Sequence, residues 1–104
     1  MAHTANPLVS VVMITYGHEN FIKEAIMGVF MQKTNFVVEL IIANDNSPDN
    51  SDAIIRKCIK AVPENTIVNY AKHQQNKGMM PNFLWAIRKT SGKYIALCEG
   101  DDFW

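Results

Sequence analysis

The sequence lacks several features that would place it quickly in a class of protein. It has no run of about 18 apolar residues, the length that crosses a bilayer. Its first residues, MAHTANP, lack the basic region and apolar core of a secretory signal peptide. Ten basic residues balance ten acidic ones, so no net charge attracts nucleic acid or an anionic membrane. We therefore expect a cytoplasmic protein with no nucleic-acid partner.

Motifs of several common chemistries are also missing. The chain contains neither glycine-rich phosphate loop, GxGxxG or GxxxxGK[ST], and no GxSxG nucleophile elbow. His3, His18 and His73 are not spaced like zinc ligands. His18 could contact a ligand, but an exposed turn histidine is the commoner case. Cys58 and Cys98 each lie in an apolar stretch, which predicts buried free thiols.

Apolar runs rich in β-branched residues alternate with stretches of helical periodicity. The predicted strands are 9–15, 36–43, 66–71 and 93–98, and the predicted helices are 21–32 (ended by Lys33-Thr34-Asn35), 53–62 and 81–91. The order βαβαβαβ with short connections predicts an α/β fold, with a mostly parallel sheet of about four strands and helices on both faces.

Local signals predict where these elements begin and end. Asn20 is a candidate cap for the first helix, and Pro63 is expected to stop the second.

Pro81 suits the first turn of the third helix, and Gly92 is expected just past its end. Gly78 suits a turn with a positive φ. Phe83, Leu84 and Ile87 are predicted to face the core.

Polar and aromatic residues follow three of the predicted strands. The first ends in Thr15-Tyr16 with Glu19 just beyond, the second in Asn44-Asp45-Asn46-Ser47, and the fourth in Glu99-Gly100-Asp101-Asp102. In open α/β sheets the ligand crevice lies outside the carboxyl ends of the strands, so these residues are expected to meet there. Helix capping is the alternative: it is favoured for Asp49, Asn50 and Ser51, and stands even with ligand binding for Asp45.

The adjacent carboxylates of Asp101 and Asp102 predict a metal. They repel each other by about 1 kcal/mol in water, and more strongly when partly desolvated. A divalent cation reverses the sign of that cost, and hard oxygen ligands suit Mg²⁺ or Mn²⁺. A solvated turn remains the alternative for the two aspartates taken alone.

Three segments in register resemble the amino-terminal half of family 2 glycosyltransferases. They are VSVVMITYGHENFIKEAIMGVFMQ, ELIIANDNSPDNS and NKGMMPNF…TSGKYIALCEGDDFW. The resemblance implies a Rossmann-like GT-A fold that binds a nucleotide-diphosphate sugar, most commonly a UDP-sugar. It also implies a divalent metal, Mn²⁺ or Mg²⁺.

The resemblance implies roles at matching positions. Nucleotide-binding roles fall on Thr15, Tyr16 (whose ring packs on the base), Glu19, Asp45 (which hydrogen-bonds the base), Gly78 in an "NxG" turn with Asn76, and Asp101; the metal falls to Asp102. Four positions depart from the family pattern: Gly17 replaces Asn, Asn44 replaces a second Asp, Glu99 replaces the first Asp of "DxDD", and Phe83 stands where an Arg is common.

We expect residues 1–7 to be a disordered leader, and 8–104 to be the donor-binding half of a longer glycosyltransferase. Family members usually transfer a hexosyl group with inversion, onto a glycan or lipid-linked acceptor in polysaccharide biosynthesis. They carry the catalytic base well beyond the position of Trp104, so the chain alone is expected to be inactive.

An exposed hydrophobic edge and self-association are expected too. Association of the full-length protein with the inner face of the membrane stays open. The alternative is a non-catalytic α/β module that binds metal or a protein partner through its acidic edge.

Overall fold

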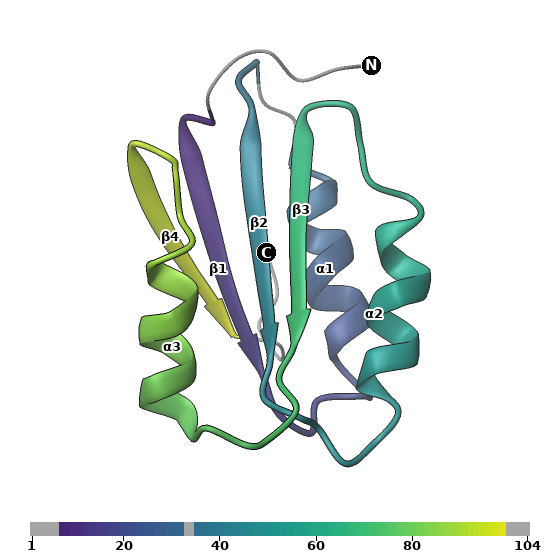
Figure 1. Ribbon diagram of the computed structural model, residues 1–104. Helices are drawn as coiled ribbons and strands as arrows, with labels where there is room; N and C mark the ends of the chain where they lie inside the picture. The colour runs from purple at the N-terminus through teal and green to yellow at the C-terminus, as the bar shows by residue number, and fades with distance from the viewer. Residues whose placement is uncertain (1–6, 33–34, 100–104) are drawn as a thin grey trace.

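Four parallel strands form one sheet in the order β3-β2-β1-β4 (Figure 1). The computed structural model describes residues 7–32 and 35–99, so the predicted leader falls almost wholly outside the described residues. The strands are β1 Val9–Thr15, β2 Val38–Asn44, β3 Thr66–Lys72 and β4 Tyr94–Glu99. This arrangement confirms the predicted fold class.

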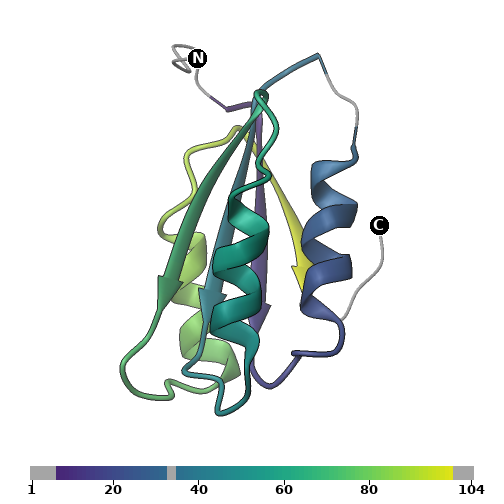
Figure 2. The same cartoon turned by 90° about the vertical axis from the view of Figure 1, so that its right-hand side faces the viewer.

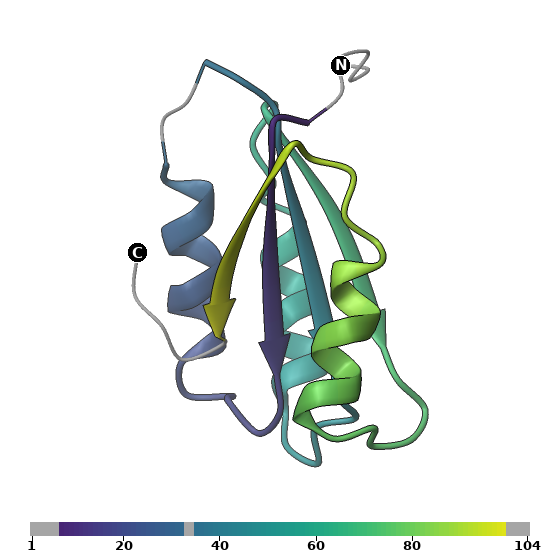
Figure 3. The same cartoon turned by 90° about the vertical axis from the view of Figure 1, so that its left-hand side faces the viewer.

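Three helices cover the two faces of the sheet. They are α1 Ile22–Phe30, α2 Ser51–Ile59 and α3 Met79–Ile87. The edge-on views show α1 and α2 on one face and α3 on the other (Figures 2 and 3). Right-handed crossovers explain this, because the chain moves from β1 to β3 and then turns back past β1 to β4. Within the described ranges, no helix is both long and apolar enough to cross a membrane.

The core is thicker on one face than on the other. Residues of β1 and β2 that point toward α1 and α2, such as Met13 and Ile42, are completely buried. The face toward α3 holds a smaller cluster built around Ile41 and Ala86. At the edge strand β4, Tyr94, Ile95 and Leu97 are 57%, 46% and 58% exposed. The expected hydrophobic edge is therefore present, while self-association stays a prediction.

The start of α1 and the end of α2 differ from the sequence predictions. Asn20 does not cap α1: the residue before the helix is Phe21, which makes no side-chain cap bond. Instead the carbonyl of His18 accepts the amides of Phe21 and Ile22, at 2.9 and 2.8 Å. The helix α2 ends at Ile59, earlier than predicted, and the amides of Ala61 and Val62 bond to the carbonyls of Cys58 and Ile59 in tighter turns that run up to Pro63.

Pro81 lies in the first turn of α3, as predicted, but Leu84 does not face the core. Leu84 is 45% exposed, because Asn82 and Ala86, four residues apart, are the positions that face the sheet. Gly78 has a φ of 88°, as its predicted turn requires.

Gly92 has a different role from the predicted helix end. The helix stops at Ile87, well before Gly92. A Cβ atom at Gly92 would lie 2.6 Å from the amide nitrogen of Ser10 and 2.8 Å from the carbonyl carbon of Val9. Only glycine lets the connection between α3 and β4 approach the start of β1 so closely.

A buried carboxylate near the amino ends of the strands was not predicted. Glu39 in β2 is 5% exposed. It accepts hydrogen bonds from the Ser10 hydroxyl at 2.8 Å, the Ser91 amide at 2.9 Å and the Asn69 amide group at 3.1 Å. The Gly92 amide in turn donates to the Ser10 hydroxyl at 2.8 Å. We call Ser10, Glu39, Asn69, Ser91 and Gly92 the amino-end cluster; it ties β1, β2, β3 and the α3–β4 connection together.

Candidate functional site

A cavity of about 410 Å³ opens at the carboxyl ends of β1 and β2, beside the start of α3. These strand ends lie at the lower edge of the sheet in Figure 1. The lining residues are Ile14, Thr15, Tyr16, His18, Asp45, Asn76, Gly78, Met79 and Asn82. Four residues to which the sequence analysis gave nucleotide-binding roles, Thr15, Tyr16, Asp45 and Gly78, thus lie around one cavity.

The turn after β1 forms one wall of the cavity. Tyr16 is 51% exposed, so its ring is accessible to a ligand. Gly17 adopts a φ of 73° and donates its amide to the Ser47 hydroxyl at 3.0 Å. The chain reverses there, and His18 returns toward the strand end, with its Nδ1 lying 2.9 Å from the Thr15 hydroxyl. A positive φ favours glycine and is also accessible to Asn, so the Gly17 backbone is compatible with the residue that the resemblance predicted.

Asp45 holds the opposite wall in place. Its amide donates to the carbonyl of Thr15 at 3.0 Å, which extends the pairing of β1 and β2 beyond the strands. Its carboxylate accepts the amides of Lys77 at 2.6 Å and Gly78 at 2.9 Å, and its carbonyl accepts the Asn76 side chain at 3.2 Å. The loop before α3 therefore folds onto Asp45. A carboxylate offers about four lone pairs, so acceptor capacity remains for a ligand.

Glu19 does not line the cavity. Its amide donates to the Asp49 carboxylate at 3.1 Å, and its own carboxylate accepts the Asn50 amide at 3.3 Å. Asp49 also accepts the amide and hydroxyl of Ser51, whereas Asn50, the residue before α2, makes no side-chain cap bond. Burial raises the pKa of Asp49, but these hydrogen bonds outweigh it and hold the pKa below its usual value. These two reciprocal hydrogen bonds, made by the Glu19 and Asp49 carboxylates and called the clasp below, join the turns that follow β1 and β2.

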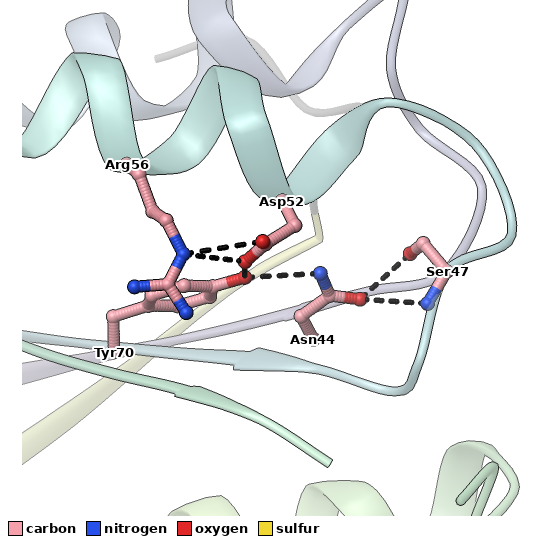
Figure 4. A network of polar contacts seen from close by, with 5 residues as sticks. All are labelled: Asn44, Ser47, Asp52, Arg56 and Tyr70. Atoms are coloured by element: carbon pink, nitrogen blue, oxygen red, sulfur yellow. Dashed lines mark hydrogen bonds and ion pairs between the residues drawn. The ribbon is translucent and has the colours of Figure 1, made fainter. Parts of the chain in front are cut away.

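A polar network behind the cavity joins α2, β3 and the end of β2 (Figure 4). The Tyr70 hydroxyl donates to Asp52 at 2.6 Å and accepts the Asn44 side-chain amide at 3.0 Å. Arg56 donates to Asp52 at 3.0 Å. The Asn44 oxygen accepts the amide and hydroxyl of Ser47, at 3.0 and 2.7 Å. Because Ser47 also accepts the Gly17 amide, the network fixes the turn that carries Tyr16 and His18.

Two pKa values follow from this network. The hydrogen bond from Tyr70, together with Arg56, lowers the pKa of Asp52. Burial, together with the bond to Asp52, raises the pKa of Tyr70 to about 12. The network also explains Asn44, where the resemblance predicted a second Asp. The Tyr70 proton is already given to Asp52, so the residue at 44 must donate, which an ionised Asp cannot do.

Asn82, a residue of the cavity lining, pairs with a buried histidine to which the sequence analysis assigned no role. His73 is 8% exposed, and its Nε2 lies 2.7 Å from the side-chain oxygen of Asn82. Asn82 also donates to the carbonyl of Ala43 at 3.0 Å, and the His73 ring meets Trp85 edge-on with centroids 4.7 Å apart. His73 and Asn82 therefore anchor α3 to β2. Their spacing in the sequence carried no recognisable motif.

Asp101 and Asp102 lie outside the described residues. Among residues 7–32 and 35–99, no group of three or more His, Cys, Asp or Glu side chains gathers to hold a metal. The strand that leads to the acidic segment does pair with β1, and the register places Glu99 opposite Ile14, a residue of the cavity wall. Cys58 and Cys98 are both buried, as predicted, and burial raises the pKa of the Cys58 thiol.

Comparison with known protein families gives a match over most of the chain. The model of the family described as "Glycosyl transferase family 2" matches residues 10–104. The Mycobacterium tuberculosis (strain H37Rv) protein Rv1520 is 40% identical over 95 residues, which are 91% of this chain and 27% of that protein. The minor teichoic acid biosynthesis protein GgaB of Bacillus subtilis is 34% identical over 94 residues, 89% of this chain and 10% of that protein. The chain thus spans a minor part of these relatives.

Solved structures share the fold. A mannosyltransferase from Pyrobaculum calidifontis, in complex with GDP-Man and Mn²⁺, superposes with a TM-score of 0.85 at 20% identity, covering 97% of this chain and 29% of that one. TarS of S. aureus, residues 1–349 in complex with UDP-GlcNAc, gives 0.79 at 21% identity, covering 91% and 27%. The four-stranded sheet and its three helices therefore match part of a GT-A fold.

Proposed function

The chain belongs to glycosyl transferase family 2, and from this premise we propose that it binds the nucleotide-diphosphate part of a sugar donor in the cavity at the carboxyl ends of β1 and β2. The observation that carries the proposal is the pairing, around one cavity, of the half-exposed Tyr16 ring with the Asp45 carboxylate. A base needs a flat apolar partner and an acceptor at its edge, and these two side chains supply both.

In this proposal the base packs on Tyr16 and donates to Asp45, while Gly78 lets the loop before α3 approach it closely. The hydrogen bonds from Lys77 and Gly78 hold the Asp45 carboxylate in place before the nucleotide arrives. Thr15 borders the base at the end of β1. Glu19 lies near the nucleotide and acts through the clasp with Asp49, which keeps the Tyr16 turn in position.

We place the diphosphate toward the carboxyl end of β4. The strand order puts β1 between β2, which leads into Asp45, and β4, which ends at Glu99 before the acidic segment. Asp101 is assigned to the ribose and diphosphate, and Asp102 to the divalent ion. Bound Mn²⁺ or Mg²⁺ would offset the charge of these carboxylates against the diphosphate and stabilise the departing nucleoside diphosphate.

The donor is proposed to be a UDP-sugar, and the reaction an inverting hexosyl transfer to a glycan or lipid-linked acceptor. The TarS and mannosyltransferase structures hold UDP-GlcNAc and GDP-Man respectively, so UDP and GDP are the nucleotides to test. We assign no general base to residues 1–104. The relatives are several times longer than the chain, and the base and acceptor site are proposed to come from the further part of such a protein.

Calorimetric titration of the chain with UDP and with GDP, each with and without Mn²⁺, tests the proposal. We expect one nucleotide to bind, more tightly with Mn²⁺. Asp45→Asn should weaken binding about tenfold, because it replaces a charged acceptor with a neutral amide. Asp102→Ala should remove the gain that Mn²⁺ provides.

Glu64→Gln is the matched control for loss of one negative charge. Glu64 is exposed before β3, at the opposite end of the sheet from the cavity, so its removal should leave binding unchanged. Binding of neither nucleotide by the wild-type chain contradicts the proposal and favours the alternative of a non-catalytic module. An equal loss in Asp45→Asn and Glu64→Gln would reduce the effect to net charge.

A further inference from the structure

We propose that His18 contacts the donor's diphosphate through its Nε2 atom, with Thr15 fixing the orientation of the ring. The inference rests on the proposed function, since it names a further residue of the same site. It assigns a ligand contact to a histidine for which the sequence alone favoured an exposed turn. The geometry that carries it is the ring's place in the cavity lining, with one nitrogen anchored and the other available.

Most side-chain donors in the cavity wall are already engaged with the protein. Asn76 donates to the carbonyl of Asp45, and Asn82 donates to the carbonyl of Ala43. The Thr15 hydroxyl pairs with Nδ1 of His18. Among the described residues, only Nδ1 of the His18 ring has a hydrogen-bond partner, and the residue belongs to the cavity lining. An unpaired polar atom of a lining side chain is available to a ligand at no cost in broken protein bonds.

The order of the strands places His18 on the path of the diphosphate. His18 follows β1, which lies between β2 and β4. Asp45, the proposed base contact, follows β2, and the acidic segment follows β4. A nucleotide that extends from the one strand end to the other crosses the end of β1. Since Tyr16 on the same turn is assigned to the base, His18 is positioned for the phosphates.

The backbone around His18 is fixed before any ligand arrives. Ser47 holds the preceding amide of Gly17 at 3.0 Å. The His18 carbonyl accepts the amides of Phe21 and Ile22, which fastens the residue to the start of α1. The backbone of His18 is held on both sides, and its ring is held by Thr15 at Nδ1. The residue therefore loses little conformational freedom on binding.

Thr15 suits an imidazole that must face an anion. A hydroxyl both donates and accepts, so Thr15 can pair with Nδ1 in either neutral tautomer and in the imidazolium. Nε2 carries a proton in the imidazolium and in the neutral ring whose Nδ1 accepts from Thr15, and these are the states that a bound anion selects; in the other tautomer Nε2 is an acceptor. Hydrogen bonds from the protonated Nε2 to a charged phosphate are among the stronger ones.

Two conservative variants separate the ring nitrogens. In His18→Asn, the side-chain amide takes the place of Nδ1, so the bond to Thr15 is kept and the Nε2 donor is lost. In His18→Gln, the longer side chain carries an amide nitrogen near the position of Nε2. Lys23→Gln is the matched control for a nearby cation, because exposed Lys23 on α1 lies outside the lining of this cavity.

The experiment titrates each variant with uridine, UMP and UDP, or with the guanosine series if GDP is the nucleotide that binds. We expect His18→Asn to bind UDP about tenfold more weakly than wild type, while its affinity for uridine stays unchanged. His18→Gln should recover part of the loss, and Lys23→Gln should match wild type. The thermal unfolding temperature of each variant should equal that of wild type, which is the control that the fold is intact.

Each outcome decides the matter. A wild-type-like affinity series in His18→Asn overturns the inference while leaving the proposed function standing. An equal loss for uridine and UDP also overturns it, because His18 would then act on the base or on the turn. If wild type binds neither nucleoside diphosphate, the proposed function fails, and the inference falls with it.

Discussion

The two ends of the sheet both gather polar side chains, but they use them differently. At the amino ends, Ser10, Asn69 and Ser91 direct their donors at the buried Glu39 carboxylate. At the carboxyl ends, polar residues of β1, β2 and the loop before α3 surround a cavity of about 410 Å³, and the ring of Tyr16 remains half exposed. The polar groups at the amino ends of the strands bond to each other, whereas some of those at the carboxyl ends line the cavity.

The difference shows how to tell a structural polar cluster from a binding site. Buried polar groups cost stability unless they are paired, so a cluster whose members satisfy one another needs no ligand to explain it. Among the described residues, the Glu39 carboxylate is paired only with neutral donors from three segments of the chain, and it holds those segments to β2. Within residues 7–32 and 35–99, Nε2 of His18 and the spare lone pairs of Asp45 have no such partner. Substitutions at the amino end should therefore change stability, and those at the carboxyl end should change binding.

Gly92→Ala should give the largest effect. A methyl group would lie 2.6 Å from the Ser10 amide nitrogen and 2.8 Å from the Val9 carbonyl carbon, and backbone atoms cannot move aside as a side chain can. We expect a loss of about 3 kcal/mol or more in the free energy of unfolding, measured by urea denaturation. Gly17→Ala is the comparison at the other end: its Cβ meets nothing within 4 Å, so only the φ of 73° opposes it, at about 1 kcal/mol. Equal losses in the two variants would contradict the steric account.

Glu39→Ala should come next, with a loss of about 2 to 3 kcal/mol in the free energy of unfolding. Removing the carboxylate leaves the Ser10 hydroxyl and the Ser91 amide without their acceptor. Glu39→Gln keeps one oxygen and should lose less than Glu39→Ala. Nucleotide affinity of the folded variants, measured by calorimetry, should stay at the wild-type value. A drop in affinity without a loss of stability would mean that the amino-end cluster serves the site.

Tyr16→Ala should produce the opposite pattern. The ring is 51% exposed and contributes little to the core, so the unfolding temperature should not change. Loss of base stacking is worth about 1 to 3 kcal/mol, so the affinity for the nucleotide that binds should fall about tenfold or more. Tyr16→Phe should retain most of the affinity. Phe21→Ala removes another exposed aromatic ring, 46% accessible and outside the cavity lining, and should leave binding unchanged.

Tyr70→Phe should have the smallest effect at neutral pH, about 1 kcal/mol, from the lost bonds to Asp52 and Asn44. Its signature is the pH dependence. The folded protein raises the pKa of Tyr70 from 10.0 to about 12, so on raising the pH the unfolded chain releases this proton first. The free energy of unfolding of wild type should therefore fall between pH 10 and about 12, more steeply than that of Tyr70→Phe. Parallel curves for the two proteins, from urea titrations across this range, would refute the proposed network at the back of the site.

Much of the fold was predictable because its signals are local. The run 9–15 is apolar and β-branched throughout, and β1 has those same bounds. Predictions that depended on single residues at element ends did less well. Asn20 failed as a cap because the His18 carbonyl takes the first amides of α1, and Leu84 failed as a core residue because Asn82 and Ala86 face the sheet. Pro63 and Gly92 carry strong local signals, yet both helices end before reaching them.

The candidate site was predictable in outline and not in its contacts. That Tyr16 and Asp45 would share one edge followed from strand direction alone. That Asp45 would hold the amides of Lys77 and Gly78 did not, since they lie more than thirty residues further along the chain. Glu19 shows the limit from the other side: its position in the sequence suggested the nucleotide, and the structure places it in the clasp between two turns.

The sequence by itself determined the alternation of strands and helices, because hydrophobic periodicity and turn residues act over a few neighbours. It also determined that Tyr16 and Asp45 meet at the carboxyl edge, because parallel strands all end there. Only the tertiary structure decided which polar groups satisfy each other and which face the cavity. Those partners are brought together by strand order and register, which join residues as distant as Glu39 and Ser91, and no local pattern carries that information.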